Sequence, residues 1–430
     1  MTSYLAAGFF LILLFVNYRL NRSVLYPPFI FCTMWLLVLL LYLLNLAPIN
    51  RLHLETFVVV STGAVLFSLG GAFALLVPRS LTTIHLTSIR NQHGRPVPFE
   101  RGSRLIKYTI IVVLGIGICF YARHTFMAAA QGSGGGFLAR ARDADVSSVN
   151  EGQHPARILS YILSWSIFAS VLFQLEALDR PFWIMTGIAF LGCILSTGRT
   201  GFLLLISALT CVQLLQSHHV RFFSALKFAR WPFLAFLILW FGLIFTNKDT
   251  SAFGTSAGAL IIIFLVSYIV GPLVALDYAL RHHNDYIGVS NHTFRFFLDI
   301  ASFFHLIQYS PPPQFDAFVA VPFPTNVYTV YKFYITDFGL YGGLCVFIII
   351  GFLHTLLYVK ARTGSKFGTY LFALTIYPLI MVIFDDQYSS FGLYLNIMLF
   401  GLSYMFSLAI FTDFRSRNKS PVAQKEISVE

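Results

Sequence analysis

Residues 54–77 read LETFVVVSTGAVLFSLGGAFALLV, and this stretch decides the fold class. Glu55 is its only charged residue. A helix needs roughly 20 consecutive apolar residues to cross the hydrocarbon core of a bilayer. We therefore predict that residues 54–77 form a transmembrane helix.

Apolar runs of the same kind recur from one end of the chain to the other. Together they predict an all-α polytopic integral membrane protein with about 11 to 13 transmembrane helices. The expected helices cover about residues 4–18, 26–47, 54–77, 105–128, 157–177, 181–196, 200–216, 231–246, 256–280, 338–359, 367–384 and 388–411.

The composition excludes a soluble protein. Of the 430 residues, 57% are hydrophobic and only 11% are charged, whereas a soluble domain carries about 25% charged residues. The net charge of +11 raises nucleic acid as a partner, but most basic residues flank apolar runs, as in other membrane proteins. The chain has no basic stripe interleaved with stacking aromatics, so we expect membrane lipid, and no nucleic acid, as a partner.

The cysteines indicate neither disulfides nor a metal site. All five lie inside apolar runs, and no two of them are spaced as CxxC. We interpret them as small buried hydrophobic residues. The adjacent His282 and His283 lack a clear third ligand, so we predict no metal and no cofactor.

Lysines and arginines in short loops predict the topology. Basic residues place the segments 78–107, 217–230 and 360–366 in the cytoplasm. The polar residues 413–430 then form a cytoplasmic tail that we expect to be disordered, and residues 1–412 form one membrane domain. Alternation assigns about 129–156 and 281–337 to the outer, periplasmic side, as a first loop and a long late loop.

The number of crossings does not fit this topology. Twelve helices leave the late loop and the helix 338–359 on inconsistent sides, so an odd number of crossings is required. Either residues 293–309 cross once more, or the helix 256–280 breaks at Gly271-Pro272 and returns, since proline removes a helical hydrogen bond.

Two outer segments carry arginines against the positive-inside bias. Arg140 and Arg142 follow a glycine-rich run, Gly132–Gly136, and are either solvated partners of nearby aspartates or part of an anion site. Arg199 lies in the turn Ser196-Thr-Gly-Arg-Thr-Gly201 between two apolar helices. It either reaches lipid phosphates or binds a phosphate-bearing substrate at the start of the following helix.

The late outer segment 281–337 combines titratable and aromatic side chains. Aromatic planes stack on sugars while amide, carboxylate and hydroxyl groups bind sugar hydroxyls, so this composition suits a glycan groove. The alternative is an interfacial aromatic belt. The residues that we single out here are His292, Arg295, His305, Asn326, Tyr328, Tyr331 and Asp337.

Two short motifs carry a resemblance to a known family. They are the Ser196–Gly201 turn and the late run Pro324-Thr-Asn-Val-Tyr-Thr, followed by Asp337-Phe-Gly339. Together they resemble the O-antigen polymerases, also called oligosaccharide repeat unit polymerases, which are related in fold to the O-antigen ligases. The likeness extends to the order of helices and outer loops over most of the chain.

The resemblance implies a bacterial inner-membrane glycosyltransferase whose active face is periplasmic. Such enzymes transfer a glycan from undecaprenyl pyrophosphate to a sugar hydroxyl of a lipid-linked repeat unit, without a metal, and a chain-length regulator protein is a further expected partner. Stabilisation of the leaving pyrophosphate would fall to Arg199, with Arg140, Arg142 and Arg295. His292, His305 and Asp337 are candidate bases, and Asn326, Tyr328 and Tyr331 would hold the glycan.

Two other functions stay open. A ligase that moves a finished glycan to another acceptor would share the fold and mechanism. A lipid-oligosaccharide flippase or transporter would need no catalytic base, although transporters tend to show internal repeats and ionisable residues near the membrane midplane.

Overall fold

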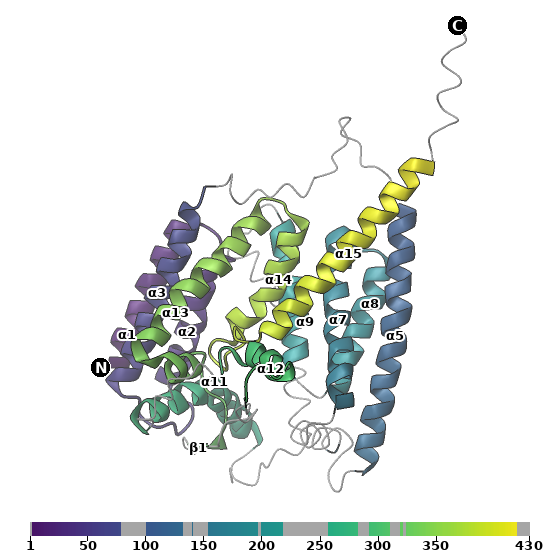
Figure 1. Cartoon of the computed structure of the whole chain (residues 1–430). Helices are drawn as coiled ribbons and strands as arrows, with labels where there is room; N and C mark the ends of the chain where they lie inside the picture. Colours follow the sequence, from purple (N-terminus) through teal and green to yellow (C-terminus); the bar gives the residue numbers. More distant parts are fainter. Residues whose placement is uncertain are drawn as a thin grey trace, which may run out of the picture. The chain divides into compact units, whose positions relative to one another are not determined.

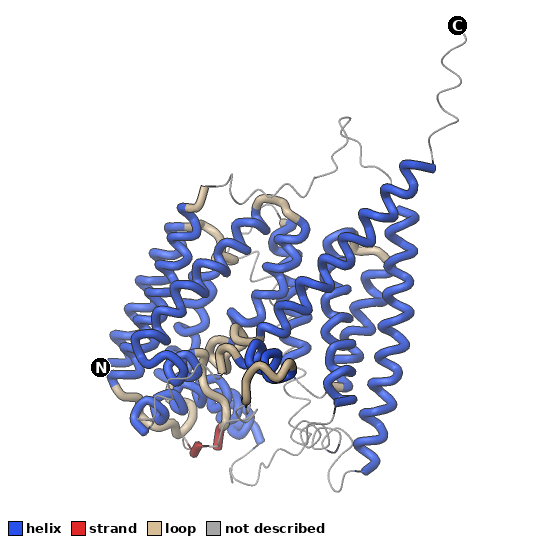
Figure 2. The backbone as a smooth tube through the Cα atoms, in the orientation of Figure 1, coloured by secondary structure: helices blue, strands red, loops and turns tan. Residues whose placement is uncertain are grey.

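The fold is all-α, as predicted from the apolar runs. The computed structural model describes residues 2–78, 100–131, 140, 154–196, 199–217, 257–282, 292–309, 319–320 and 324–418 (Figures 1 and 2). Within these residues the only sheet is a pair of two-residue antiparallel strands, β1 (Val319–Ala320) and β2 (Pro324–Thr325). Everything else of regular structure is helical.

The chain divides into two compact units. Unit 1 comprises residues 1–82 and 213–394, and unit 2 comprises residues 83–212 and 395–430. The helices of unit 1 are α1 (Thr2–Leu20), α2 (Pro27–Leu43), α3 (Leu54–Leu76), α11 (Ala257–His282), α12 (Arg295–Phe303), α13 (Tyr331–Arg362) and α14 (Lys366–Met381). Those of unit 2 are α5 (Glu100–Gln131), α7 (His154–Glu176), α8 (Arg180–Leu195), most of α9 (Arg199–Gln216) and most of α15 (Phe391–Asn418).

Several helices are long and apolar enough to cross a membrane. Among the described residues they are Thr2–Leu20, Leu54–Leu76, Arg104–Ala130, Tyr331–Arg362 and Phe391–Ile410. The other apolar helices, such as α2 and α14, are shorter. Many large apolar side chains on these helices are exposed, for example Leu76 at 77% and Phe406 at 67%. Such a surface is suited to lipid.

Sequence-local signals explain where several helices begin. Pro27 and Pro28 open α2, where a missing backbone N–H costs nothing. Asp179 and Ser365 cap α8 and α14 by accepting the backbone N–H groups of Phe182 and Gly368. These starts lie within one residue of the predicted ones.

The closest helix pair in unit 1 is α3 with α13. A side chain at Gly70 would overlap the backbone carbonyl of Ile348, and one at Gly351 would overlap that of Phe67. Glycines on both helices therefore let the two backbones touch, and close van der Waals contact of this kind drives helix association where no water is present. Phe31 of α2 stacks on Phe67 with ring centroids 4.3 Å apart and completes the contact.

The helix α13 is sharply bent near its start. Gly339 has φ 72° and ψ 172°, a conformation that residues with a side chain rarely adopt. The bend brings the Tyr334 carbonyl against Gly343, where a side chain would overlap it. Residues 331–338 therefore pack back on the rest of α13. The predicted helix 338–359 missed this first part, since Lys332 and Asp337 suggest a loop.

A small polar cluster joins α1, α2 and α3. The Asn17 amide donates to Ser68 Oγ at 3.0 Å and to Cys32 Sγ at 3.4 Å. All three residues are buried. Hydrogen bonds between apolar helices of this kind are worth about 1 kcal/mol each.

Unit 2 has an ionic centre of its own. Lys107 of α5 lies 3.2 Å from both Glu176 and Asp179 and is only 3% exposed. Tyr404 of α15 donates to Glu176 at 2.7 Å. Lys107, the last residue of the predicted cytoplasmic segment 78–107, is therefore a buried ion-pair partner.

The helix α11 runs as one element through Pro272. Tyr268 contacts Phe384, just beyond α14, with ring centroids 5.1 Å apart, while Asp277 contacts the start of α3. These two residues are separated by about 13 Å of helix, yet both touch the end of unit 1 where α3 starts and α14 finishes. This stretch of α11 therefore crosses that end, as Figure 1 shows.

The course of α11 bears on the number of membrane crossings before α13. The helix shows no break at Gly271-Pro272, and α12, with nine residues, is too short to cross a bilayer. Neither predicted solution is therefore seen. The expected helix 231–246, most of the loop 129–156 and the tail residues 419–430 lie outside the described residues.

We predict that Gly351→Ala loosens unit 1, because its methyl group would meet the backbone of α3. Overpacking costs about 1–3 kcal/mol, so the thermal midpoint of the purified protein in detergent should fall. Gly187→Ala, on a helix with open space around it, is the control. An unchanged midpoint in Gly351→Ala would contradict the packing described here.

Candidate functional site

The polar side chains of unit 1 gather at one end, which we call the polar end: the end where α3 and α13 begin and where α14 finishes. The start of α13 is joined there to two other segments. Tyr331 donates a hydrogen bond to the Val60 carbonyl of α3 (3.0 Å), and the Val330 N–H donates to the Val382 carbonyl just beyond α14 (3.0 Å). Three buried aspartates, Asp277, Asp337 and Asp386, lie at or beside this end. They come from three different segments and make separate networks.

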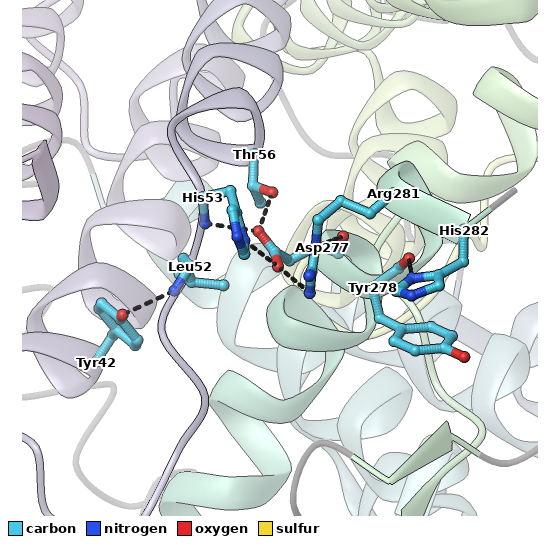
Figure 3. A network of polar contacts seen from close by, with 8 residues as sticks. All are labelled: Tyr42, Leu52, His53, Thr56, Asp277, Tyr278, Arg281 and His282. Atoms are coloured by element: carbon cyan, nitrogen blue, oxygen red, sulfur yellow. Dashed lines mark hydrogen bonds and ion pairs between the residues drawn. The ribbon is translucent and has the colours of Figure 1, made fainter. Parts of the chain in front are cut away.

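Asp277 joins α11 to the start of α3 (Figure 3). Its Oδ1 accepts the His53 backbone N–H at 2.8 Å and the Thr56 hydroxyl at 2.7 Å. Its Oδ2 lies 3.1 Å from His53 Nδ1 and 2.9 Å from Arg281 Nη2. His53 is the N-cap residue of α3 but forms no cap with its own side chain. Asp277 therefore caps α3 from another helix, where a negative charge is favourable.

Cationic and aromatic groups surround this buried carboxylate. The side chains of Arg281 and His53 are 39% and 54% exposed, whereas that of Asp277 is 1% exposed. His282 stacks on Tyr278 with ring centroids 4.0 Å apart, as Figure 3 shows. At the polar end, the partly exposed Arg281 is thus fixed by its ion pair with the buried Asp277, and His53 and His282 lie near it.

Asp337 ties the late segment to α13. Its Oδ2 accepts the backbone N–H and the hydroxyl of Thr293 at 2.7 and 2.6 Å, and its Oδ1 accepts the His292 N–H at 3.5 Å. These residues lead directly into α12. Asp337 is 5% exposed, so in this structure it anchors the backbone that positions His292.

Asp386 lies in the non-helical segment 382–390 between α14 and α15. Its Oδ1 accepts the Tyr334 hydroxyl at 3.0 Å and the Tyr388 backbone N–H at 2.8 Å. Burial raises the pKa of this carboxyl from 3.8 to about 6, while Ser389, Tyr388 and Tyr334 act in the opposite direction. Tyr388 in turn places its hydroxyl 3.1 Å from Nδ1 of the buried His354.

One side of the first turns of α13 connects the segments that meet at the polar end. Tyr331, Tyr334 and Asp337 follow one another at three-residue spacing, so they lie along one side of the helix. They bind α3, the segment 382–390 and the residues before α12, respectively. Tyr331 is fully buried against Trp35 and Phe347. It is a packing residue here rather than a surface for a glycan.

The remaining predicted residues of unit 1 lie around this side of α13. The His292 ring packs on Phe333 with centroids 4.7 Å apart, and the buried Tyr328 ring lies 3.7 Å from the Lys332 ammonium. Arg295 pairs with Asp299 at 3.9 Å. His305 is exposed and has a positive φ of 58°, and Asn326 is half-buried.

Of the three predicted arginines of unit 2, two lie among the described residues. Arg199 is the first residue of α9. The Nε of Arg140 is buried and has no hydrogen-bond partner among the described residues. Arg142 lies outside the described residues.

Sequence reasoning missed Asp277 and Asp386. Asp277 lies at the end of an apolar run. The only nearby residue that suggests an ion pair for it is Arg281, four residues later. The pair Asp385-Asp386 between two apolar helices was a clearer signal, because buried carboxylates in membrane proteins commonly mark function.

Comparison with known proteins identifies no relative. The chain matches no protein-family model, no curated protein and no solved structure.

We predict that Asp277→Asn destabilises unit 1 by on the order of 2 kcal/mol, because it leaves Arg281 unpaired and weakens the cap of α3. Asp299→Asn is a matched control, since its pair with Arg295 has the same four-residue spacing but is more exposed. The measurement is the thermal midpoint of each purified variant. Equal shifts for the two variants would contradict the role of Asp277.

Asp386 should make stability depend on pH. Its folded pKa of about 6 lies above its ordinary value of 3.8, so the folded chain holds the proton more tightly than the unfolded chain. This contribution is complete below the ordinary pKa and is lost as the pH rises through about 6. The loss is on the order of 3 kcal/mol at neutral pH.

Thermal midpoints of the wild type and of Asp386→Asn between pH 4 and pH 8 test this prediction. The variant should lack the part of the pH dependence that belongs to Asp386 and should be more stable than the wild type at pH 8. Parallel pH profiles would contradict it.

Proposed function

We propose that this protein is a membrane glycosyltransferase that polymerises lipid-linked oligosaccharide repeat units for O-antigen, capsule or exopolysaccharide. The glycan would pass from undecaprenyl pyrophosphate to an acceptor sugar hydroxyl at the periplasmic face of the bacterial inner membrane. One observation carries the proposal. At the polar end, Asp337 of the motif that resembles the polymerase family accepts hydrogen bonds from the backbone of His292 and Thr293.

The grouping of helix ends supports the proposed face. The predicted topology assigns the starts of α3 and α13 and the far end of α14 to the outer side. In unit 1 these ends meet through the Tyr331–Val60 and Val330–Val382 hydrogen bonds. Groups that bind phosphate or sugar, such as Arg281, Arg295 and Lys332, lie at the same end.

His292 is our first choice for the general base. Both oxygens of Asp337 already accept hydrogen bonds from the chain, which leaves Asp337 as an anchor. His292 is partly exposed and is fixed by that anchor, whereas His305 is exposed on the turn after α12. A base must lie within hydrogen-bond reach of its hydroxyl, and an anchored imidazole meets this condition better.

Arg199, Arg140, Arg142 and Arg295 remain the proposed pyrophosphate-binding residues. A leaving pyrophosphate gathers negative charge, and guanidinium groups stabilise that charge through paired hydrogen bonds. Arg199 is the first residue of α9, where the helix dipole also favours anions. Asn326 would hold the acceptor glycan, whereas Tyr328, like Tyr331, is buried.

One observation favours a second function, that of a flippase or transporter. Asp386 is an ionisable group buried between helices, and such groups mark ion and substrate pathways in membrane proteins. A flippase would move the lipid-linked unit across the bilayer of a reconstituted vesicle without lengthening the glycan.

The purified protein should convert lipid-pyrophosphate-linked repeat units into a glycan ladder, and a chelator should leave the ladder unchanged. We expect Arg199→Ala and His292→Gln to lose most of the product, at least 100-fold by the typical size of base and charge-stabilising effects (about 10² to 10⁴). Arg199→Lys should also be impaired, because an ammonium lacks the paired donors.

His305→Gln is the matched control for His292→Gln. A product made of single transfers to a different acceptor would indicate a ligase. Absence of any glycan transfer by a correctly folded protein, together with translocation in vesicles, would replace the polymerase by the flippase.

A further inference from the structure

The segment 382–390 is a stretch of non-helical backbone inside unit 1. Val382 is fully buried, Ile383 is 2% exposed and Asp386 is 5% exposed. Non-helical backbone among apolar helices is tolerated only where protein encloses it or where it lines a polar cavity. Both the buried apolar side chains and a few polar contacts hold this segment.

The carboxylate of Asp386 is incompletely satisfied. Oδ1 accepts two hydrogen bonds, from Tyr334 and from Tyr388. Oδ2 is buried and has no partner among the described residues. No ion pair joins Asp386 to a lysine, arginine or histidine in the part of the chain that the structure describes. Asp277, by contrast, has an arginine and three donors.

An isolated buried carboxylate costs several kcal/mol, so such a group takes up a proton or binds a cation. A metal ion needs several oxygen or nitrogen ligands, and no group of three or more His, Cys, Asp or Glu in the described residues could hold one. Tyr334 and Tyr388 also point donors, not lone pairs, at Asp386. A proton on Oδ2 neutralises the carboxylate with no further ligand.

We propose that Asp386 is a proton-binding site, and that the bound proton keeps the segment 382–390 in its buried position. Loss of the proton places a charge in a site that stabilises it poorly, and exposure of the segment to water relieves that cost. Asp386 is not among the residues that we propose for glycan transfer.

The groups that face Asp386 determine how the proton is held. Tyr334 approaches from α13, Tyr394 from α15, and Ser389 and Tyr388 from its own segment, where Asp385 accepts the Asp386 backbone N–H. From α14, Tyr377 lies near Asp385. None of these groups is a cation, and Ser389, Tyr388 and Tyr334 favour the ionised carboxylate through hydrogen bonds.

The same proton controls a second contact. Tyr388 of this segment holds its hydroxyl 3.1 Å from His354 Nδ1, and His354 Nε2 is buried without a partner among the described residues. Release of the segment would withdraw Tyr388 from His354 Nδ1. It would also break the Val330–Val382 hydrogen bond at the start of α13. Protonation of Asp386 is thus linked to the buried Tyr388–His354 contact and to the Val330–Val382 hydrogen bond at the polar end.

Infrared difference spectroscopy of the purified protein measures the proton directly. The carbonyl band of a protonated carboxylic acid should titrate in the wild type with a midpoint above that of an ordinary aspartate, and it should be missing from Asp386→Asn. Asp299→Asn, which removes an exposed aspartate, should retain the band. A wild-type spectrum without a titrating band that belongs to Asp386 would overturn the proposal.

Tyr334→Phe tests the site without removing the carboxyl. The hydroxyl of Tyr334 stabilises the ionised form, so its loss should move the titration midpoint to higher pH. Tyr331→Phe, an equally buried tyrosine that donates to Val60 instead, should leave the midpoint unchanged. Equal midpoints in the two variants would place the titrating group elsewhere. A midpoint that falls as sodium chloride replaces choline chloride would show that sodium, rather than a proton alone, occupies the site.

Hydrogen exchange tests the link to the segment. After correction for the intrinsic pH dependence, the peptide 382–390 should exchange at least tenfold faster at pH 8 than at pH 5 in the wild type, since a tenfold change follows from a pKa shift of about one unit. Asp386→Asn, which mimics the protonated form, should exchange slowly at both values. Equal corrected rates in the wild type would refute the coupling.

Discussion

The contact between α3 and α13 is the constraint on which unit 1 depends. Gly70 and Gly351 let the two backbones touch, and in an apolar surrounding this close approach is a main source of helix association. It also fixes the rest of the unit, because the bend at Gly339 then directs residues 331–338 across the polar end. The three polar side chains on that short stretch can reach their partners only from this position.

The polar end shows two ways in which an apolar bundle holds a carboxylate. Asp277 and Asp337 are surrounded by donors, and Asp277 has an arginine as well. Such groups join segments that are distant in the chain. Asp386 has donors on one oxygen only and no cation among the described residues. The first kind stabilises a fixed arrangement, whereas the second kind favours a protonated state and a segment that can change its environment.

The sequence predicted the helices well and the site only in part. Apolar length identified α1, α3, α7 and α9 nearly to their ends, because a membrane helix is specified by local hydrophobicity. It failed at the start of α13, where Lys332 and Asp337 suggest a loop although their partners are supplied by the fold. The late-segment residues were recognised by composition. Asp277 and Asp386 were not, because their importance comes from contacts made across the fold.

The cap of α3 also has a consequence for biosynthesis. Thr56 and its partner Asp277 are 221 residues apart, which corresponds to roughly 10 to 45 s of translation at about 5–20 residues per second. The glycine partner of α3 on α13 emerges later still. The first three helices must therefore enter the membrane and wait, with the start of α3 uncapped, until the ribosome has made most of the chain. Insertion factors that shield unfinished helices would act on this protein during that interval.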